Sequence, residues 1–210
     1  MEKIMIRNGL KLNVRRTLLV GLAFFAVSMF WQVYDNIMPL FLLDFNFTAT
    51  ERGIIMALDN VLAVVLLPFM GILSDNFPQK WRSKFGRRMP FIVVGSVLGA
   101  ITFMLVNFAH NQLNLVLMLV TTAFVLLCMC FYRTPAVALM PDVTVKPLRS
   151  KANAIINLTG TLGGILVLVL GMIFATSKNH YMEYTGYVLA VCAIMLTGLI
   201  VFISLGNQLH

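Results

Sequence analysis

Six long apolar runs dominate the sequence and limit what the chain can fold into. Each run has roughly the 20 residues that an α-helix needs to cross the hydrocarbon core of a bilayer. Of the 210 residues, 60% are apolar and only 11% are charged, so a soluble core could not enclose all of the apolar surface. We therefore predict an all-α membrane protein. Its six transmembrane helices are expected over Thr17–Leu43, Glu51–Leu73, Pro90–Phe108, Leu113–Leu139, Asn153–Ala175 and Tyr187–Leu205.

Basic residues are distributed unevenly between the connections of these helices. Thirteen of the 16 Lys and Arg lie in the N-terminal arm, the second connection and the fourth connection, whereas the opposite side holds only Arg52 and Lys178. Basic connections stay in the cytoplasm, so both chain ends are predicted to be cytoplasmic. The predicted organisation is a basic arm at 1–16, a transmembrane domain at 17–205 and a short end at 206–210, in the cell membrane.

Several classes of function are disfavoured by the same distribution. The net charge of +8 is explained by membrane topology, so no nucleic-acid partner is expected. The predicted outer connections are too short to form a domain, so function must lie within the helical bundle. We find no nucleophile–base pair, phosphate-binding loop or metal-binding cluster, and we expect neither an enzyme nor a cofactor or metal site.

Three ionisable residues stand out inside the predicted spans, away from their ends, where each costs about 2.5–3.5 kcal/mol on insertion scales. Asp35 and Asp59 are expected at the same depth, ~12 Å below the outer surface, and Arg133 at ~9 Å from the inner surface. Two carboxylates at one depth can share a proton, as proton coupling requires. The alternatives are a polar contact between helices for the aspartates and snorkelling for Arg133.

Polar and small residues near these positions extend the candidate site. Asn153, Asn157 and Thr161 are spaced four apart on one helix face, where they either line an aqueous path or make interhelical contacts. Two glycine pairs, Gly95 with Gly99 and Gly160 with Gly164, predict close helix approach. The candidate substrate- and proton-binding residues are Asp35, Asp59, Arg133, Gln32, Tyr34, Asn36, Asn60 and Asn157.

A weak internal repeat is visible in the chain. Tyr34-Asp35 precedes Pro39 near the end of the first predicted helix, and Tyr132-Arg133 precedes Pro135 near the end of the fourth. A three-plus-three inverted repeat would make these two helices equivalents that run in opposite directions. The repeat would place their charges near opposite membrane faces, in agreement with the depth estimate.

The second connection carries the most specific motif. Gly71 and Asp75 form a Gly-x-x-x-Asp element, and after ten residues the chain reads Gly86-Arg87-Arg88-Met89-Pro90-Phe91-Ile92. Glycine permits close approach or a tight turn, Asp75 can accept hydrogen bonds at a helix end, and arginines pair with carboxylates or headgroups. Simple membrane anchoring would account for the two arginines but not for both glycine-containing elements together.

This motif resembles the signature loop between helices two and three of the major facilitator superfamily. The insert before Gly86 is similar to that of sucrose–proton symporters and of the glycoside–pentoside–hexuronide group. Leu58-Asp59-Asn60 and the segment from Arg133 to Asp142 agree with this resemblance, although the insert is longer than in the commoner pattern and Asn76 replaces the usual Arg. The resemblance implies a twelve-helix fold of two halves, of which this chain would be the N-terminal six-helix half.

The expected function is sugar symport coupled to a cation, the proton being the expected one, by alternating access. The resemblance implies that Gly71, Asp75, Gly86, Arg87 and Arg88 form a cytoplasmic latch. The expected partners are a sugar, the coupling cation, the lipid bilayer and a second six-helix half, either covalent or separate. Two alternatives remain: a non-transporting or partner-dependent half, and a major facilitator transporter of a non-sugar substrate.

Overall fold

The computed structural model describes residues 12–76, 88–175 and 184–206, and every long element in them is an α-helix. Six of these helices are long and apolar enough to span a membrane, which confirms the predicted fold class. They are α2 (Val14–Asp44), α3 (Ala49–Asp75), α5 (Met89–Asn111), α6 (Leu115–Val143), α7 (Arg149–Ala175) and α8 (Tyr184–Gly206), with a short 3-10 helix, η2 (Lys146–Leu148), before α7.

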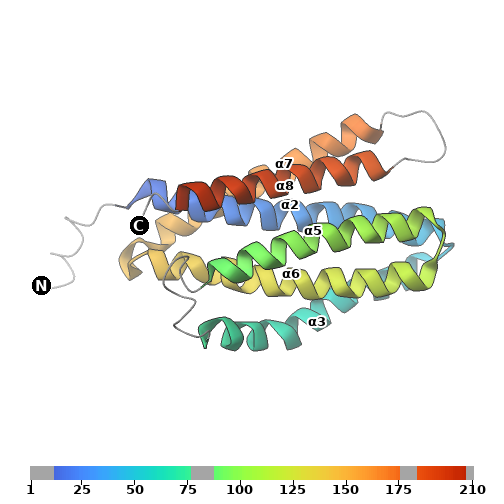
Figure 1. The fold of residues 1–210 in the computed structure, drawn as a ribbon, viewed down its shortest axis with the longest axis horizontal. Helices are drawn as coiled ribbons and strands as arrows, with labels where there is room; N and C mark the ends of the chain where they lie inside the picture. The colour runs from blue at the N-terminus through green and yellow to red at the C-terminus, as the bar shows by residue number, and fades with distance from the viewer. Residues whose placement is uncertain (1–11, 77–87, 176–183, 207–210) are drawn as a thin grey trace, which may run out of the picture.

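Successive long helices run in opposite directions along one long axis (Figure 1). α2 begins and α8 ends at the same end of the bundle, which we call the Arg88 end. The opposite end, where α2 leads into α3, is called the Thr48 end. α2 packs against α7, α8 and α6, whereas α5 packs against α6 and α8, and the principal neighbour of α3 is α6.

All six helices extend beyond their predicted bounds at one end or both, and the extensions of α2, α6 and α7 at the Arg88 end are the ones that matter here. α2 begins at Val14 rather than Thr17, and α6 continues past Leu139 and through Pro141 to Val143. α7 begins at Arg149 rather than Asn153, so its first turn contains basic residues that we assigned to a connection. These turns are too polar for a hydropathy criterion, and Arg149 stabilises the corner by donating to the carbonyl oxygens of Pro141 (3.0 Å) and Thr144 (3.2 Å). Most of the predicted basic arm, residues 1–11, and the end at 207–210 lie outside the described residues.

Side-chain caps fix the starts of α3 and α6 at the Thr48 end. The Thr48 hydroxyl accepts a hydrogen bond from the backbone N–H of Glu51, and the Glu51 carboxylate accepts one from the backbone N–H of Thr48, which makes a complete capping box. Asn114 caps α6 by accepting from the N–H of Leu117 at 3.0 Å. These caps satisfy donors that a helix leaves unpaired at its first turn.

Glycines allow close helix contacts, as the sequence predicted for Gly95, Gly99 and Gly160, whereas Gly163 rather than the predicted Gly164 is the other close contact of α7. A Cβ atom on Gly163 of α7 would lie 2.6 Å from the backbone oxygen of Phe25 in α2, and one on Gly160 would lie 2.8 Å from the Ser28 hydroxyl. A Cβ on Gly95 of α5 would lie 2.9 Å from that of Tyr132 in α6. At Gly163 such a distance excludes any side chain without movement of the backbone, and at Gly160 the Ser28 side chain would have to move, so α2 and α7 meet along a seam of glycines.

Candidate functional site

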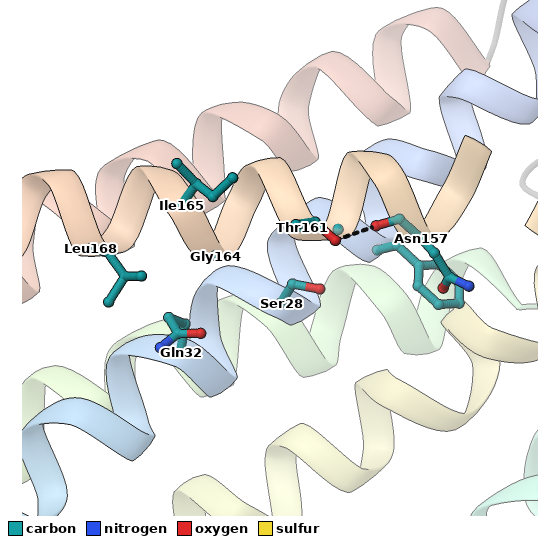
Figure 2. A pocket seen from close by; sticks show the side chains of 9 residues that line it. Ser28, Gln32, Asn157, Thr161, Gly164, Ile165 and Leu168 are labelled. Atoms are coloured by element: carbon teal, nitrogen blue, oxygen red, sulfur yellow. Dashed lines mark hydrogen bonds between the residues drawn. The ribbon is translucent and has the colours of Figure 1, made fainter. Parts of the chain in front are cut away.

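A groove of about 520 Å³ lies between α2 and α7, beside the seam of glycines (Figure 2). Four polar side chains line it, Ser28 and Gln32 from α2 and Asn157 and Thr161 from α7. Gly160 and Gly164 form its floor, and its apolar walls are Phe24, Ile165 and Leu168. The groove therefore brings together two residues that the sequence predicted on separate helices, Gln32 and Asn157.

The spacing of these residues explains why they share one cavity. Residues four apart lie on the same face of a helix, which applies to Ser28 with Gln32 and to Asn157 with Thr161. The Thr161 hydroxyl donates to the backbone oxygen of Asn157 at 2.9 Å, so its lone pairs remain directed outward for a ligand (Figure 2). The polar lining consists of hydroxyls and amides and carries no charge. Such groups both donate and accept hydrogen bonds, as recognition of a neutral, hydroxyl-rich ligand requires.

Asp35 continues the polar face of α2 toward the Thr48 end. Ser28, Gln32 and Asp35 follow the i, i+4, i+7 pattern of one helix face. The Asp35 side chain is exposed in this chain, so helices of the bundle do not enclose it. Pro39 lies one turn further along α2 and has no N–H, so the helix itself supplies no donor to the Asp35 carbonyl.

Arg133 of α6 reaches α2 on the other side of Asp35. Its guanidinium carbon lies 5.3 Å from the centre of the Trp31 ring, which is a cation–π contact. Trp31 is one turn from Asp35 toward the Arg88 end, so Arg133 and Asp35 are not level, as the depth estimate predicted. Within the described part of the chain Arg133 forms no salt bridge.

The remaining predicted residues lie at different places. Tyr34 is buried in the core, where its ring stacks on Phe30 at 6.2 Å, so it does not share the face of Asp35. Asn36 lies near the Tyr187 hydroxyl, which donates to the Val167 oxygen at 3.1 Å. Asn60 is exposed on α3, and Asp59 precedes it on the same helix, although its side chain is outside the described structure.

The predicted latch is described only in part. The buried Arg88 Nε lies 2.6 Å from Asp142 Oδ2, so this ion pair joins the start of α5 to the end of α6. Gly71 of α3 faces Thr134 of α6, because a Cβ atom there would lie 3.8 Å from the threonine methyl group. Gly86, Arg87 and the Asp75 side chain lie outside the described part of the chain, so the latch remains a prediction for them.

Three residues that sequence reasoning left out belong to these contacts. Ser28 precedes Gln32 by one turn, and this spacing was a usable signal for its place in the groove. Asp142 ends the segment from Arg133 that carries the family resemblance, but only the tertiary contact reveals that it pairs with Arg88. Arg52 had been counted only as an outer basic residue, yet its Nη1 donates to the Pro39 carbonyl oxygen at 3.4 Å.

Comparisons with known proteins agree with this architecture. The sequence profile of the Major Facilitator Superfamily matches residues 20–207. The chain is 26% identical over 159 residues to the sucrose transport protein SUC3 of Arabidopsis thaliana. That match covers 67% of this chain and 26% of the plant protein, so the chain spans about a quarter of its relative. No solved structure gives a significant match.

Proposed function

The chain belongs to the Major Facilitator Superfamily, and from this premise we propose that it carries out sugar symport coupled to a cation, the proton. The observation that carries the proposal is the α2–α7 groove together with Asp35 on the same face of α2. Uncharged hydrogen-bonding groups suit a sugar, and an adjacent carboxylate suits a proton. The relative named as a sucrose transport protein supports a sugar as substrate.

In this proposal each polar group has a separate task. Gln32 and Asn157 bind sugar hydroxyls, and Trp31 offers an aromatic face and an indole N–H that is buried without a hydrogen-bond partner. Asp35 takes up the proton, and Asp59 shares this role or adjusts it. Arg133 binds substrate, or pairs with a carboxylate in another conformation of the cycle, in which it leaves the Trp31 ring.

Alternating access needs a second wall for the groove. Large apolar side chains of α3 and α7, such as Val64 and Met172, are exposed on the described chain. We propose that a second six-helix unit, covalent or separate, covers part of this surface, that lipid covers the rest, and that substrate binds between the two units. The Arg88 end would then face the cytoplasm of the cell, and the Arg88–Asp142 pair would stabilise the state closed at that end.

Uptake into proteoliposomes tests the coupling role of Asp35. The complete transporter would be reconstituted, an acid exterior imposed and accumulation of labelled sucrose measured. We expect Asp35→Asn to abolish accumulation driven by the pH gradient while sugar exchange at equal pH continues, because the variant still binds sugar but carries no proton. Full gradient-driven accumulation in Asp35→Asn would contradict the proposal.

Sugar binding to the groove needs a matched pair of variants. Gln32→Ala removes an amide from the groove, and we expect about tenfold weaker sugar binding, which equals roughly 1.4 kcal/mol. Gln112→Ala removes the same group from the exposed C-cap of α5, outside the groove, and should leave affinity unchanged. Equal affinities in the two variants would show that the groove does not bind the sugar.

A second candidate is transport of a non-sugar substrate that carries a carboxylate. Arg133 favours it, because its guanidinium lies beside the proposed site and forms no ion pair in the described residues. Competition for uptake by a uronate or other organic acid, compared with a neutral sugar, separates the two candidates. If Arg133→Gln selectively abolished competition by the acid, the acid would be the better substrate class.

A further inference from the structure

Arg52 occupies an unusual position at the first turn of α3. Its side chain is half-buried, its Nη1 donates to the Pro39 carbonyl oxygen at 3.4 Å, and its Nε is buried without a hydrogen-bond partner. The adjacent Glu51 is turned toward the helix cap instead, where its Oε2 accepts from the Thr48 N–H and hydroxyl, each at 2.8 Å. No carboxylate in the described ranges forms a salt bridge with Arg52. A partly desolvated guanidinium with an unused donor is costly, so its placement calls for a function.

The contact with Pro39 places Arg52 close to the proposed proton site. Pro39 and Asp35 are one helical turn apart on α2, which is ~6 Å along the axis. Trp31, with Arg133 over its ring, lies one turn from Asp35 in the opposite direction. Asp35 therefore lies between two guanidinium groups, Arg52 toward the Thr48 end and Arg133 toward the Arg88 end.

We propose that Arg52 is a positioning residue that stabilises the ionised form of Asp35 when the site opens at the Thr48 end. The inference rests on the proposed function, because it assigns to Arg52 the regulation of the same carboxylate. A cation within about 10 Å of an exposed carboxylate favours its charged form. Arg52 would thus set the proton concentration at which Asp35 loads on that side, and Arg133 would take over as counter-charge after the conformational change.

Few other charged groups face Asp35 from the helices that pack against α2. α3 carries Arg52 with Glu51 beside it, and also Asp59, whose side chain lies outside the described structure, and α6 contributes Arg133. At this depth α7 and α8 present uncharged groups, among them Leu168 and the Tyr187 phenol, since Arg149 and Lys151 lie at the Arg88 end of α7. His110 of α5 is paired with Asp44 at the tip of the bundle, with Nε2 2.9 Å from Oδ2.

The test follows protonation of Asp35 without requiring transport. The 210-residue chain contains two tryptophans, so Trp81→Phe leaves Trp31, one turn from Asp35, as the single fluorescent reporter. The emission of this protein in lipid nanodiscs would be titrated with pH. We expect the Trp31 emission to change in one step with pH, and this step should be absent in Asp35→Asn. Arg52→Gln should move its midpoint to higher pH by about one unit, because the stabilising cation is lost.

Two further variants separate electrostatics from structural damage. Arg52→Lys keeps the charge and should restore at least half of the shift, whereas a packing role would not distinguish lysine from glutamine in this way. Arg15→Gln makes the same change at an exposed site at the Arg88 end and should leave the midpoint unchanged. An unchanged midpoint in Arg52→Gln, an equal shift in Arg52→Lys, or the absence of any step that depends on Asp35 would overturn the proposal.

The outcomes also separate this inference from the function on which it rests. If no gradient-driven sugar uptake occurs but the step depending on Asp35 shifts in Arg52→Gln, the assignment of Arg52 stands and sugar symport is wrong. If uptake requires Asp35 but the midpoint of the fluorescence step is unchanged in Arg52→Gln, symport stands and the assignment of Arg52 is wrong.

Discussion

Helices α2 and α3 are consecutive, similar in length at 31 and 27 residues, and both apolar, yet they occupy opposite environments (Figure 1). α2 lies inside the bundle, where Val33 and Phe41 are fully buried. α3 lies at its edge, where Val64 is 77% exposed and none of its described side chains is buried. The contrast shows that apolar character alone does not reveal whether a helix faces protein or lipid. We therefore expect α2 to contribute much more than α3 to the stability of the bundle, because α3 mainly forms outer surface. Paired substitutions in the two helices can test this.

The largest difference is expected from truncating a phenylalanine in each helix. Phe30 of α2 is 1% exposed and contacts Phe103, so Phe30→Ala leaves a cavity and should cost about 3–5 kcal/mol of unfolding free energy. Phe69 of α3 is 65% exposed, and Phe69→Ala should cost less than about 1 kcal/mol. Unfolding in mixed detergent micelles with increasing SDS measures both. Similar losses would mean that α3 is as tightly packed as α2.

The glycine seam gives a second pair, in which the effects have opposite signs. Gly163→Ala should destabilise the chain by about 2 kcal/mol, because the new Cβ meets backbone rather than a movable side chain. On α3, a Cβ at Gly53 meets nothing within 4 Å, so Gly53→Ala should stabilise by about 0.5–1 kcal/mol through helix propensity alone. Thermal denaturation followed by size-exclusion chromatography would resolve the two signs. A stabilising Gly163→Ala would show that the seam is looser than described.

Hydroxyls on α6 refine the comparison, because this helix contacts both α2 and α3. The buried Tyr132 hydroxyl donates to the Ala23 oxygen of α2 at 2.7 Å, so Tyr132→Phe should cost about 1–1.5 kcal/mol. Thr134 faces Gly71 of α3 but donates only within its own helix, to Cys130 at 3.2 Å. Thr134→Val should therefore cost less than about 0.5 kcal/mol. The same SDS titration measures both, and a reversed order would show that α3 is tied to α6 more firmly than α2 is.

The smallest expected effect concerns the local start of α3. Thr48→Ala breaks the capping box and should destabilise the first turn of α3 by about 1 kcal/mol. Because α3 lies at the edge of the bundle, the free energy of global unfolding should change little. Hydrogen exchange should increase at the N–H groups of the first turn of α3, whereas exchange in α2 stays unchanged. Thr48→Ser retains the hydroxyl and is the control. Faster exchange throughout α2 would contradict the independence of the two helices.

Hydropathy and charge were sufficient to predict the six helices, because each span must satisfy its backbone internally and cover itself with apolar side chains. The same criteria could not predict that α2 is more buried than α3, because lipid and the protein interior accept the same apolar residues. Within the site, the four-residue spacing of Asn157 and Thr161 predicted their common face, and the structure places this face and Gln32 along one groove. Tyr34 was grouped with Asp35 by sequence adjacency, but adjacent helical residues point about 100° apart, and Tyr34 faces the core.

Tertiary contacts of charged residues were the least predictable part. Asp142 pairs with Arg88 across 54 residues of sequence, and no local pattern encodes that distance. Arg52 matched the profile of a membrane-edge base, and only its contact with Pro39 relates it to Asp35. Both depend on how neighbouring helices pack, which composition and spacing do not determine.

The seam between α2 and α7 has a consequence for protein engineering. At Gly163 the seam meets the backbone oxygen of Phe25, whereas the groove beside it is lined by Gln32, Asn157 and Thr161. The scaffold and these three lining positions can therefore be varied separately. Libraries that randomise Gln32, Asn157 and Thr161 while keeping Ser28, Gly160 and Gly163 fixed should retain folded protein, and they offer a direct route to altered ligand preference.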